Sequence, residues 1–573
     1  MSDTIFHGGT ALTMAERADP RDSAGPTAVA VRDGRIAAVG SDDEVLSLRR
    51  DGTRLVALRG RTVCPGFIDA HHHFTLAAWC QLGIDLSGCR SAAEAIERIR
   101  RRAATAPGDS WLYAFNYAPR RFAHGPALTR HHLDAVAGER PVVAIHFSYH
   151  EAVVSSAGLR VAGIGRATPD PIGGRIARDR SGEPTGELLE TAAGPVEALA
   201  RTAGASLLYE DWVTAAARYA AGLLATGIIH VCDPGIDAML EGYLRRANDE
   251  GRLPLPVSML FVAARGGLFR PPEDRLGGPA TGAVLNGLPV GGLKLFADGG
   301  SRCAVCTGLL ESFAGVARLA GRAVRLRRPA LLRDASAPER PRLGRDGRLR
   351  LGYLHYAPGQ LAALCARAQA HGFGVAVHAA CNAAIDGVLA AYEGLPAGAH
   401  RHRVEHLVSL DGQQARRLAA TGAIGVVQPS YIGGLGDEWE AMPTPPRLHS
   451  VPLRLLLDAG MALAGSSDAP VAPYAPLWGM QAAITRRTDA GLRHQPDQAI
   501  TAWEALHLWT GGAALATHQA GRRGVLQPGA AADLVVLSRN PLVVPPEQFD
   551  TIRVERTVIG GATVFEAGGT RDA

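Results

Sequence analysis

The 573-residue sequence predicts an α/β protein: a TIM (β/α)8 barrel with a small β-sandwich domain formed by both termini. Three observations support this prediction. Short apolar strands alternate with amphipathic helical segments through the middle of the chain, which favours a parallel sheet. Turn-rich strands occur at both ends of the chain. Polar residues recur at the carboxyl ends of several central strands, the face where TIM barrels carry their active sites.

The two ends of the chain share a β-rich pattern that the middle lacks. Ala28–Val31 and Ile36–Val39 flank the dipeptide Asp33-Gly34, which is a strong hairpin signal. The C-terminus shows the same pattern around Gly560-Gly561. We therefore expect one small β-sandwich domain built from residues 1–64 and 515–573, and a barrel domain built from residues 65–514.

Eight segments have the length and apolar character of buried parallel strands. They are Val63–Ile68, Gly227–Val231, Leu255–Phe261, Gly292–Phe296, Gly374–Val377, Arg403–Glu405, Ala423–Val427 and Met461–Ala464. Intervening segments such as Pro358–Ala370 and Asp411–Ala420 are expected to be helical. An open doubly wound sheet is the alternative, and the polar residues after successive strands favour the barrel.

Two long stretches do not fit a minimal barrel. Residues from about 75 to 205 separate the first two strands and include a strand of their own at Val142–Phe147, so we expect an inserted subdomain there. The second stretch is the insertion Ser312–Arg350, which is rich in arginine, proline and alanine. We expect it to be a solvated surface loop or flexible insertion.

Composition narrows the class of protein. Hydrophobic residues make up 47% of the chain and charged residues 20%, as in soluble globular proteins. The net charge of +5 is small and dispersed, which argues against a nucleic-acid partner. The sequence shows neither a bilayer-spanning apolar stretch nor a signal peptide, so we expect no membrane partner and a cytoplasmic location. The scattered cysteines, including the CxxC pair Cys303 and Cys306, are expected to be ordinary thiols.

The chain contains a single lysine, Lys294, among 60 basic residues. A codon bias toward arginine explains why lysine is scarce but not why this one remains. Lys294 lies in an apolar strand, where a buried ammonium group is costly. One interpretation is an ion pair with a nearby carboxylate such as Asp298. The other is a neutral amine that has captured carbon dioxide, because the resulting carbamate can bridge two cations and arginine cannot form it.

Residues of the kinds that bind metal ions stand at the ends of the other predicted strands. His71 and His73 end the first strand and, two residues apart, face the same side. His378 ends the fifth strand, His406 ends the sixth and Asp468 follows the eighth. Taken alone, each of these residues is explained equally well by a structural role and by metal binding. Together they place imidazole and carboxylate groups at one face of a barrel, which predicts a divalent metal site.

This arrangement resembles the metal-binding set of the amidohydrolase superfamily, and longer stretches resemble its amidohydrolase family 3 branch of YtcJ-like and N-substituted formamide deformylase-like proteins. The matching stretches are Pro65–His73, Gly173–Glu190, Lys294–Arg302, Arg401–His406 and Gly465–Val471. Ala379-Ala380-Cys381-Asn382 departs from the usual Ala-Ile-Gly-Asp after the fifth-strand histidine, and the insertion Ser312–Arg350 is longer than usual in the branch. Neither departure affects the metal-binding residues.

The resemblance implies a binuclear metal centre. It assigns His71, His73 and Asp468 to the more buried metal ion and His378 and His406 to the second, with carboxylated Lys294 bridging the two. It implies two divalent metal ions, with zinc favoured by imidazole and carboxylate ligands, and carbon dioxide as the carbamate on Lys294. Asp468 would take a proton from a metal-bridging water and return it to the leaving nitrogen. The bridging hydroxide would then cleave an amide-type C–N bond in an amide, an N-substituted formamide or a cyclic amide.

The resemblance places His150 near a small-molecule substrate. Arg302 and Gln428 lie just past the fourth and seventh strands and are expected to line the same pocket, although structural hydrogen bonding explains all three residues equally well. Two alternatives stay open: deamination or another non-hydrolytic reaction on the same scaffold, and a non-catalytic binding relative. Deaminases of the superfamily typically carry a glutamate shortly after the fifth-strand histidine, and none follows His378. Non-catalytic relatives usually lose ligands, whereas all six are present. Members are often dimers or larger, so a homo-oligomer is also left open.

Overall fold

The centre of the computed structural model is a barrel of parallel strands in the order β25-β23-β22-β21-β17-β15-β14-β7. The model describes residues 3–568 apart from 16–24, 107–109, 123–125, 204–208, 329–331, 333–340 and 397. The barrel strands are β7 (Phe67–Asp69), β14 (Ile228–Ile236), β15 (Val257–Phe261), β17 (Leu288–Phe296), β21 (Val375–Cys381), β22 (Arg403–Leu410), β23 (Ile424–Val427) and β25 (Ala462–Gly465). Each overlaps one of the eight predicted strands, so the predicted TIM barrel is confirmed.

Backbone hydrogen bonds close the barrel between its first and last strands. The Ala70 amide donates to the Gly465 carbonyl at 3.3 Å, and the Asp468 amide donates to the His71 carbonyl at 2.9 Å. The second of these bonds joins two predicted metal ligands through the main chain. Closure of the barrel therefore brings residues that are almost 400 positions apart in the sequence to the same point.

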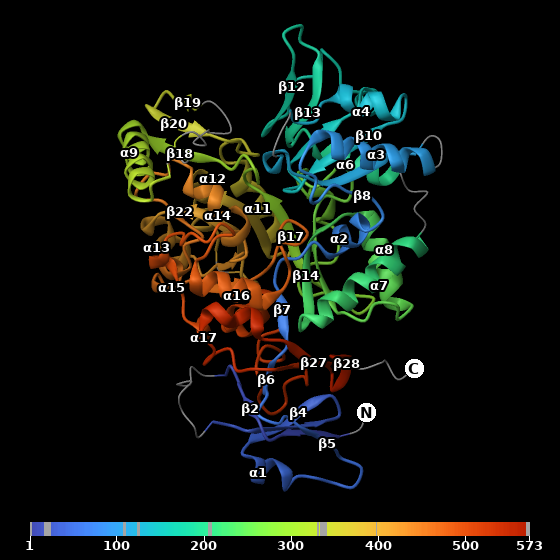
Figure 1. Cartoon of the computed structure of the whole chain (residues 1–573), viewed down its shortest axis with the longest axis vertical. Helices are drawn as coiled ribbons and strands as arrows, with labels where there is room; N and C mark the ends of the chain where they lie inside the picture. The colour runs from blue at the N-terminus through green and yellow to red at the C-terminus, as the bar shows by residue number, and fades with distance from the viewer. Residues whose placement is uncertain are drawn as a thin grey trace.

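Helices surround the barrel (Figure 1). They include α2 (Phe74–Cys80), α7 (Tyr209–Ala225), α8 (Ala238–Asp249), α11 (Gln360–Ala370), α12 (Asn382–Tyr392), α13 (Gly412–Ala420), α14 (Tyr431–Glu440), α15 (Leu453–Asp458), α16 (Pro476–Thr485), α17 (Ala502–His507) and α18 (Ala513–Ala516). In α12, Ile385 and Leu389 lie one turn apart on its buried face, as expected for an amphipathic helix packed on a sheet. None of the helices in the described ranges combines the length and apolarity needed to cross a bilayer.

Two small sheets from the chain ends pack together below the barrel (Figure 1). One has the order β4-β3-β1-β5 and the other the order β2-β6-β26-β27-β28, so the second combines N-terminal and C-terminal segments. Their strands are β1 (Thr4–His7), β2 (Thr10–Ala11), β3 (Ala28–Arg32), β4 (Arg35–Gly40), β5 (Arg54–Ala57), β6 (Thr62–Pro65), β26 (Leu534–Leu537), β27 (Val554–Ile559) and β28 (Ala562–Glu566). Phe6 and Val29 of the first sheet share a core with Val63 and Val536 of the second.

The predicted first strand, residues 63–68, is wrong as a single element. The chain instead forms β6 in the terminal sheet and β7 in the barrel, with Gly66 between them. A Cβ atom at Gly66 would lie 2.5 Å from the Ile229 side chain, so only glycine allows the chain to pass this close to β14. The apolar sequence pattern of a strand continues through this change of sheet, because both β6 and β7 are buried.

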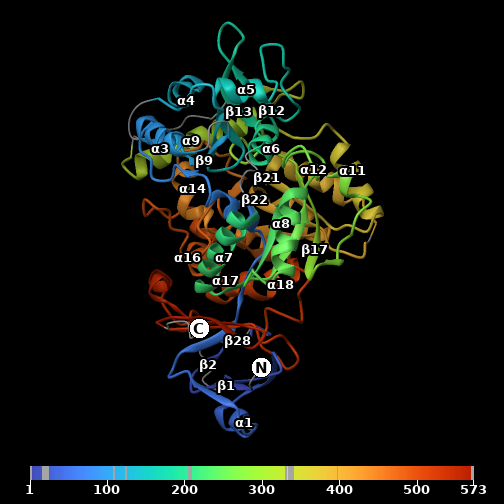
Figure 2. The same cartoon turned by 90° about the vertical axis from the view of Figure 1, so that its right-hand side faces the viewer.

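The stretch between β7 and β14 forms a six-stranded sheet at the top of the molecule in the order β12-β13-β11-β10-β9-β8 (Figures 1 and 2). Its strands are β8 (Ile84–Asp85), β9 (Leu112–Tyr117), β10 (Val142–His146), β11 (Glu151–Val154), β12 (Gly174–Arg178) and β13 (Pro184–Glu190). The helices of the same stretch are α3 (Ala92–Thr105), α4 (Arg130–Ala137), α5 (Ser156–Val161) and α6 (Gly194–Ala203). The predicted strand at residues 142–147 corresponds to β10.

The expectation that residues 312–350 form a loop is wrong for the part that the structure describes. Helix α9 (Leu309–Arg325) occupies its first half, and β19 (Arg342–Leu343) and β20 (Arg348–Leu351) form a small sheet with β18 (Val305–Gly308). Gly315, Leu319 and Ala323 recur every four residues and are buried, and Leu319 and Ala323 form a small cluster with Ala441. The abundance of arginine concealed this stripe in the sequence.

Candidate metal centre

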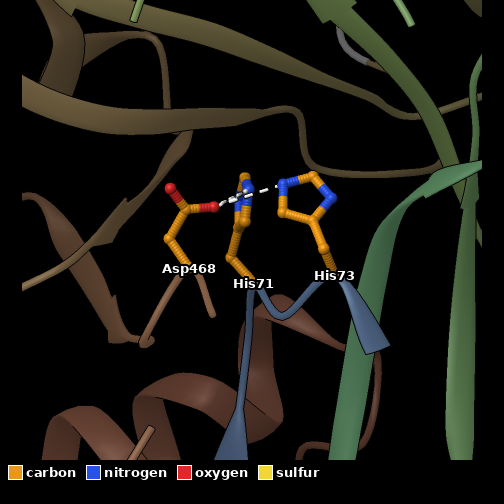
Figure 3. Close-up of side chains that lie close together, drawn as sticks. All are labelled: His71, His73 and Asp468. Atoms are coloured by element: carbon orange, nitrogen blue, oxygen red, sulfur yellow. Dashed lines mark ion pairs between the residues drawn. The ribbon is translucent and has the colours of Figure 1, made fainter. Parts of the chain in front are cut away.

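His71, His73 and Asp468 converge at the carboxyl ends of the first and last barrel strands (Figure 3). Oδ1 of Asp468 lies 3.2 Å from Nε2 of His71 and 3.2 Å from Nε2 of His73. Yet Nε2 of His71 and Oδ1 of Asp468 are buried without a hydrogen-bond partner among the described residues. Two buried ligand atoms that face one another without a hydrogen-bond partner, with Nε2 of His73 beside them, suit a shared cation.

A buried carboxylate orients His71. Nδ1 of His71 lies 2.5 Å from Oε2 of Glu405, which in turn pairs with the Arg403 guanidinium at 2.8 and 3.0 Å. Burial raises the pKa of Glu405, but the charge of Arg403 and the bond from His71 outweigh burial and hold the pKa below its usual value. The carboxylate is therefore ionised and can only accept a hydrogen bond. Nδ1 of His71 carries the proton, and the Nε2 lone pair is free for a metal ion.

His378 and His406 form a second group beside the first. Their ring centroids lie 4.3 Å apart, and the His406 ring lies 4.8 Å from that of His71. Nδ1 of His406 donates to Oε1 of Gln428 at 3.0 Å, which leaves its Nε2 free. Nε2 of His378 faces the Gly299 carbonyl at 3.4 Å, which leaves its Nδ1 free. Burial lowers the pKa of both imidazoles well below the usual value, so both are neutral, as metal ligands must be.

The backbone at His406 explains how two consecutive residues reach the same centre. Glu405 and His406 are neighbours in β22, and consecutive side chains of a regular strand point to opposite faces. His406 has φ +78°, in the left-handed region, which breaks this alternation. Glu405 and His406 therefore both approach His71, Glu405 through its hydrogen bond to Nδ1 and His406 with its ring centroid 4.8 Å away. Asp468, with φ +57°, is also in the left-handed region.

Lys294 lies inside the barrel with its amine unpaired. Its side chain is 1% exposed, and Nζ has no hydrogen-bond partner among the described residues. The ion pair with Asp298 is not formed, because the Asp298 carboxylate instead accepts hydrogen bonds from the amides of Ala304, Ala380 and Cys381. Burial lowers the pKa of Lys294 to about 8. An amine that is easily deprotonated and lacks a counterion suits reaction with carbon dioxide.

Tyr431, at the start of α14, holds the second oxygen of Asp468. Its hydroxyl donates a hydrogen bond to Oδ2, which leaves Oδ1 directed at the two histidines. Burial raises the pKa of Tyr431 well above its usual value, so the hydroxyl keeps its proton. Burial also opposes ionisation of Asp468, but the neighbouring imidazoles His71 and His73 hold its pKa well below the usual value.

The predicted metal ligands border a cavity of about 500 Å³. His73, Lys294, His378, His406 and Asp468 line it, and His71 lies fully buried behind them. The donor set therefore fits a divalent metal centre: imidazole nitrogens with free lone pairs, a carboxylate oxygen and an amine, converging at the floor of one cavity.

The three residues predicted to contact substrate differ in position. His150 and Arg302 line the cavity, and Nδ1 of His150 is 2.6 Å from Oε2 of Glu190 while Nε of Arg302 is 2.9 Å from Oε1 of Glu151. Gln428 is not part of the cavity lining in the described ranges. Its amide bridges His406 and Ser466, so its position favours the orientation of His406 over contact with substrate.

Glu405, Tyr431 and Glu190 were not among the predicted site residues. Glu405 directly precedes a predicted ligand and Glu190 ends one of the stretches that resemble the family, so both could have been flagged. Tyr431 lies three residues after Gln428 with no local signal of its own. Only barrel closure, which brings the β23–α14 connection beside the β25 end, reveals its contact with Asp468.

The chain is similar to known proteins over nearly its whole length. The sequence profile of the amidohydrolase family matches residues 54–565. An N-substituted formamide deformylase from Arthrobacter pascens is 30% identical over 558 residues, 95% of each chain. The putative amidohydrolase YtcJ from Bacillus subtilis is 28% identical over 98% of this chain and 99% of its own. An uncharacterized metal-dependent hydrolase from Pyrococcus horikoshii has the same fold, with a TM-score of 0.67 and 22% identity over 95% of this chain and 99% of its own. The predicted resemblance is confirmed, and the chain belongs to the amidohydrolase family.

Proposed function

We propose that the protein is a metal-dependent hydrolase that cleaves an amide-type C–N bond in a small molecule. Family membership supports hydrolysis of C–N bonds in general. The observation that carries the more specific proposal is the convergence of His71, His73 and Asp468, in which Nε2 of His71 and Oδ1 of Asp468 face one another without a hydrogen-bond partner. A structural cluster of buried polar groups would satisfy its hydrogen bonds internally, whereas a metal site leaves the ligand atoms free.

Two groups of residues would hold two divalent ions, with zinc the metal that imidazole and carboxylate ligands favour. His71, His73 and Asp468 would bind one ion, and His378 and His406 the other. Lys294 would bridge them after its neutral amine forms an N–C bond to carbon dioxide and loses a proton. When bound, the ions supply the Lewis acidity that acidifies a water molecule and polarises the substrate carbonyl.

The protein residues would manage the proton and the substrate. Oδ1 of Asp468 would accept the proton of the attacking water and pass it to the leaving nitrogen. The Tyr431 hydroxyl would keep the carboxylate oriented by holding Oδ2 throughout. His150, fixed by Glu190, and the Arg302 segment border the same cavity and would contact the rest of the substrate.

Elemental analysis of protein purified without chelator or affinity-bound metal tests the proposal. About two divalent ions per chain, together with hydrolysis of at least one member of an amide, formamide and cyclic-amide panel, is the expected result. One ion per chain would replace the binuclear centre by a mononuclear one. A metal content near zero that metal and bicarbonate cannot restore would refute the proposal.

A further inference from the structure

Two thiols that the proposed metal centre does not use lie together in the lining of the cavity. The thiol of Cys381, at the end of β21, donates to Sγ of Cys303, in the segment after β17, over a distance of 2.6 Å. Cys303 belongs to the CxxC motif, and Cys381 lies in the stretch 379–382 that departs from the family pattern. The fold therefore joins two sequence features that the proposed reaction leaves unexplained.

The thiol that contacts Cys303 belongs to Cys381 and not to Cys306, its neighbour in the CxxC motif. Cys306 lies in β18 between Val305 and Thr307, and both of these residues line the cavity. Because successive side chains of a strand point to opposite faces, the Cys306 side chain is turned to the other face of the small sheet. Cys306 is therefore a nearby thiol with a different environment, which makes it an internal control.

A buried carboxylate holds the main chain beside both sulfur atoms. Oδ2 of Asp298 accepts hydrogen bonds from the amide of Ala304, next to Cys303, at 2.9 Å and from the amide of Cys381 at 3.2 Å. Oδ1 of the same carboxylate accepts from the amide of Ala380 at 2.9 Å. One side chain thus fixes the two segments that carry the thiols relative to each other.

Asn382 and its neighbour Ala383 link the same two segments further along. The Cys306 amide donates to Oδ1 of Asn382 at 3.1 Å, and Nδ2 of Asn382 donates to the Cys306 carbonyl at 2.7 Å. The Ala383 amide donates to the Ala304 carbonyl at 3.1 Å. Residues 303–306 and 381–383 therefore run side by side, and the main chain brings the two sulfur atoms together before any bond forms between them.

The two thiols differ in their exposure to the cavity. Cys303 is partly exposed and Cys381 is buried, although both border the same space of about 500 Å³. The hydrogen bond to Cys303 and burial raise the pKa of the Cys381 thiol well above its usual value, so Cys381 keeps its proton. A small oxidant that enters the cavity therefore meets Cys303 first, with a protonated thiol directly behind it.

We propose that Cys303 and Cys381 are a site of oxidative modification, in which a hydroperoxide oxidises Cys303 and Cys381 then closes a disulfide. In the first step the Cys303 thiolate attacks one oxygen of the O–O bond and becomes a sulfenic acid. The other oxygen leaves and takes up the proton that the Cys303 thiol released, which gives water or an alcohol. In the second step the Cys381 sulfur displaces the sulfenic hydroxyl, which leaves as water with the Cys381 proton. The two thiols lose two electrons in total, and one peroxide gains them.

The disulfide would tie a loop at the cavity to the strand that carries a proposed metal ligand. The Gly299 carbonyl, four residues before Cys303, faces Nε2 of His378 at 3.4 Å. His378 lies three residues before Cys381 in β21. Oxidation would therefore restrain the loop after β17 against the end of β21. The thiols would react in the same way whether or not the protein hydrolyses a C–N bond.

Peptide mapping without reduction, after treatment of the full-length protein with hydrogen peroxide, tests the pairing. We expect a 303–381 disulfide in the wild type and in Cys306→Ser, its loss in Cys303→Ser and in Cys381→Ser, and its reversal by dithiothreitol. A 303–306 bond would overturn the inference. Oxidation to sulfinic acids without any cross-link would overturn it equally, and neither readout depends on catalytic activity.

Trapping of the sulfenic acid with dimedone tests the order of the two steps. Cys381→Ser removes the thiol that closes the bond, so we expect labelled Cys303 to accumulate in this variant after peroxide treatment. Cys303→Ser should leave Cys381 unlabelled. Cys381 is the N-cap of α12, a position that serine favours, so C381S should fold, and circular dichroism verifies this. An unlabelled Cys303 in C381S would overturn the assignment of Cys303 as the thiol that reacts first.

Discussion

Nδ1 of His71 and Oε2 of Glu405 form a hydrogen bond of 2.5 Å, and both side chains are fully buried. The bond fixes the imidazole tautomer and directs Nε2 toward Asp468. Arg403 completes the arrangement by binding both oxygens of Glu405. A chain of guanidinium, carboxylate and imidazole thus lies behind the proposed metal centre, and its charges make the lone pair on His71 a stronger donor.

Glu405→Gln should weaken metal binding without removing a ligand. The amide leaves Arg403 without its charge partner and no longer selects the His71 tautomer, so we expect the affinity for zinc to fall by roughly 10- to 100-fold. Competition with a zinc chelator measures this effect, and circular dichroism verifies the fold. Glu393→Gln is the control, because Glu393 pairs with Arg417 at the surface. Equal zinc affinity in E405Q and wild type would contradict the assigned role.

Lys294→Arg should abolish hydrolysis. Arginine preserves the positive charge but cannot form a carbamate, and its longer side chain enters a closely packed site. We expect about one metal ion per chain or fewer in this variant, measured by elemental analysis, with activity below detection. Full activity in K294R would remove the carbamate bridge from the proposed centre.

Tyr431→Phe should slow turnover without emptying the site. The change removes one hydrogen bond to Oδ2 of Asp468 and keeps the aromatic ring beside His406. Loss of one hydrogen bond to a charged group corresponds to about 1.5 kcal/mol, or roughly tenfold in kcat. Steady-state kinetics on metal-loaded protein test this, and a KM change at constant kcat would instead assign Tyr431 to substrate binding.

Protonation of His146 should lower the free energy of unfolding of the protein in mild acid. Burial lowers the pKa of His146 to about 4, against 6.5 for the free imidazole. Between these values the unfolded chain binds a proton that the folded protein does not, so the free energy of unfolding falls as pH drops from 6.5 to 4. The loss reaches about 3 kcal/mol, and none is expected above pH 6.5.

Thermal unfolding of His146→Gln at pH 7 and pH 4.5 isolates this contribution. The Tm of H146Q should change less between the two pH values than the Tm of wild type. His131→Gln, at an exposed position in α4, should follow wild type. Parallel pH profiles for all three proteins would show that protonation of His146 is not coupled to folding.

Metal removal should destabilise the fold around the barrel's upper face. Ligands that bind only the folded state stabilise it by about 4 kcal/mol at a thousandfold excess over Kd. Dialysis against a chelator should therefore lower Tm, and zinc with bicarbonate should restore it. The same Tm before and after chelation, in protein shown by elemental analysis to have lost metal, would argue that the cluster is structural without metal.

The sequence by itself determined the barrel and the chemical types of its candidate ligands. Both follow from local pattern: apolar runs of strand length predict strands, and polar residues directly after them lie at the active-site face. His71, His73, Lys294, His378, His406 and Asp468 were all identifiable this way. The apolar stripe of α9 is also a local sequence pattern, but the arginines around it made the segment resemble a solvated loop.

Only the tertiary structure decided which groups are paired and which are free. Lys294 lacks a counterion because Asp298 is occupied by main-chain amides, and Gln428 lies behind His406 because Ser466 holds its amide. Cys303 meets Cys381, 78 residues away, rather than Cys306. These pairings depend on the distances that barrel closure sets and on the backbone conformation of individual residues such as His406. The sequence pattern predicts neither the distances nor these conformations, because it gives the order of residues along the chain and not their neighbours in space.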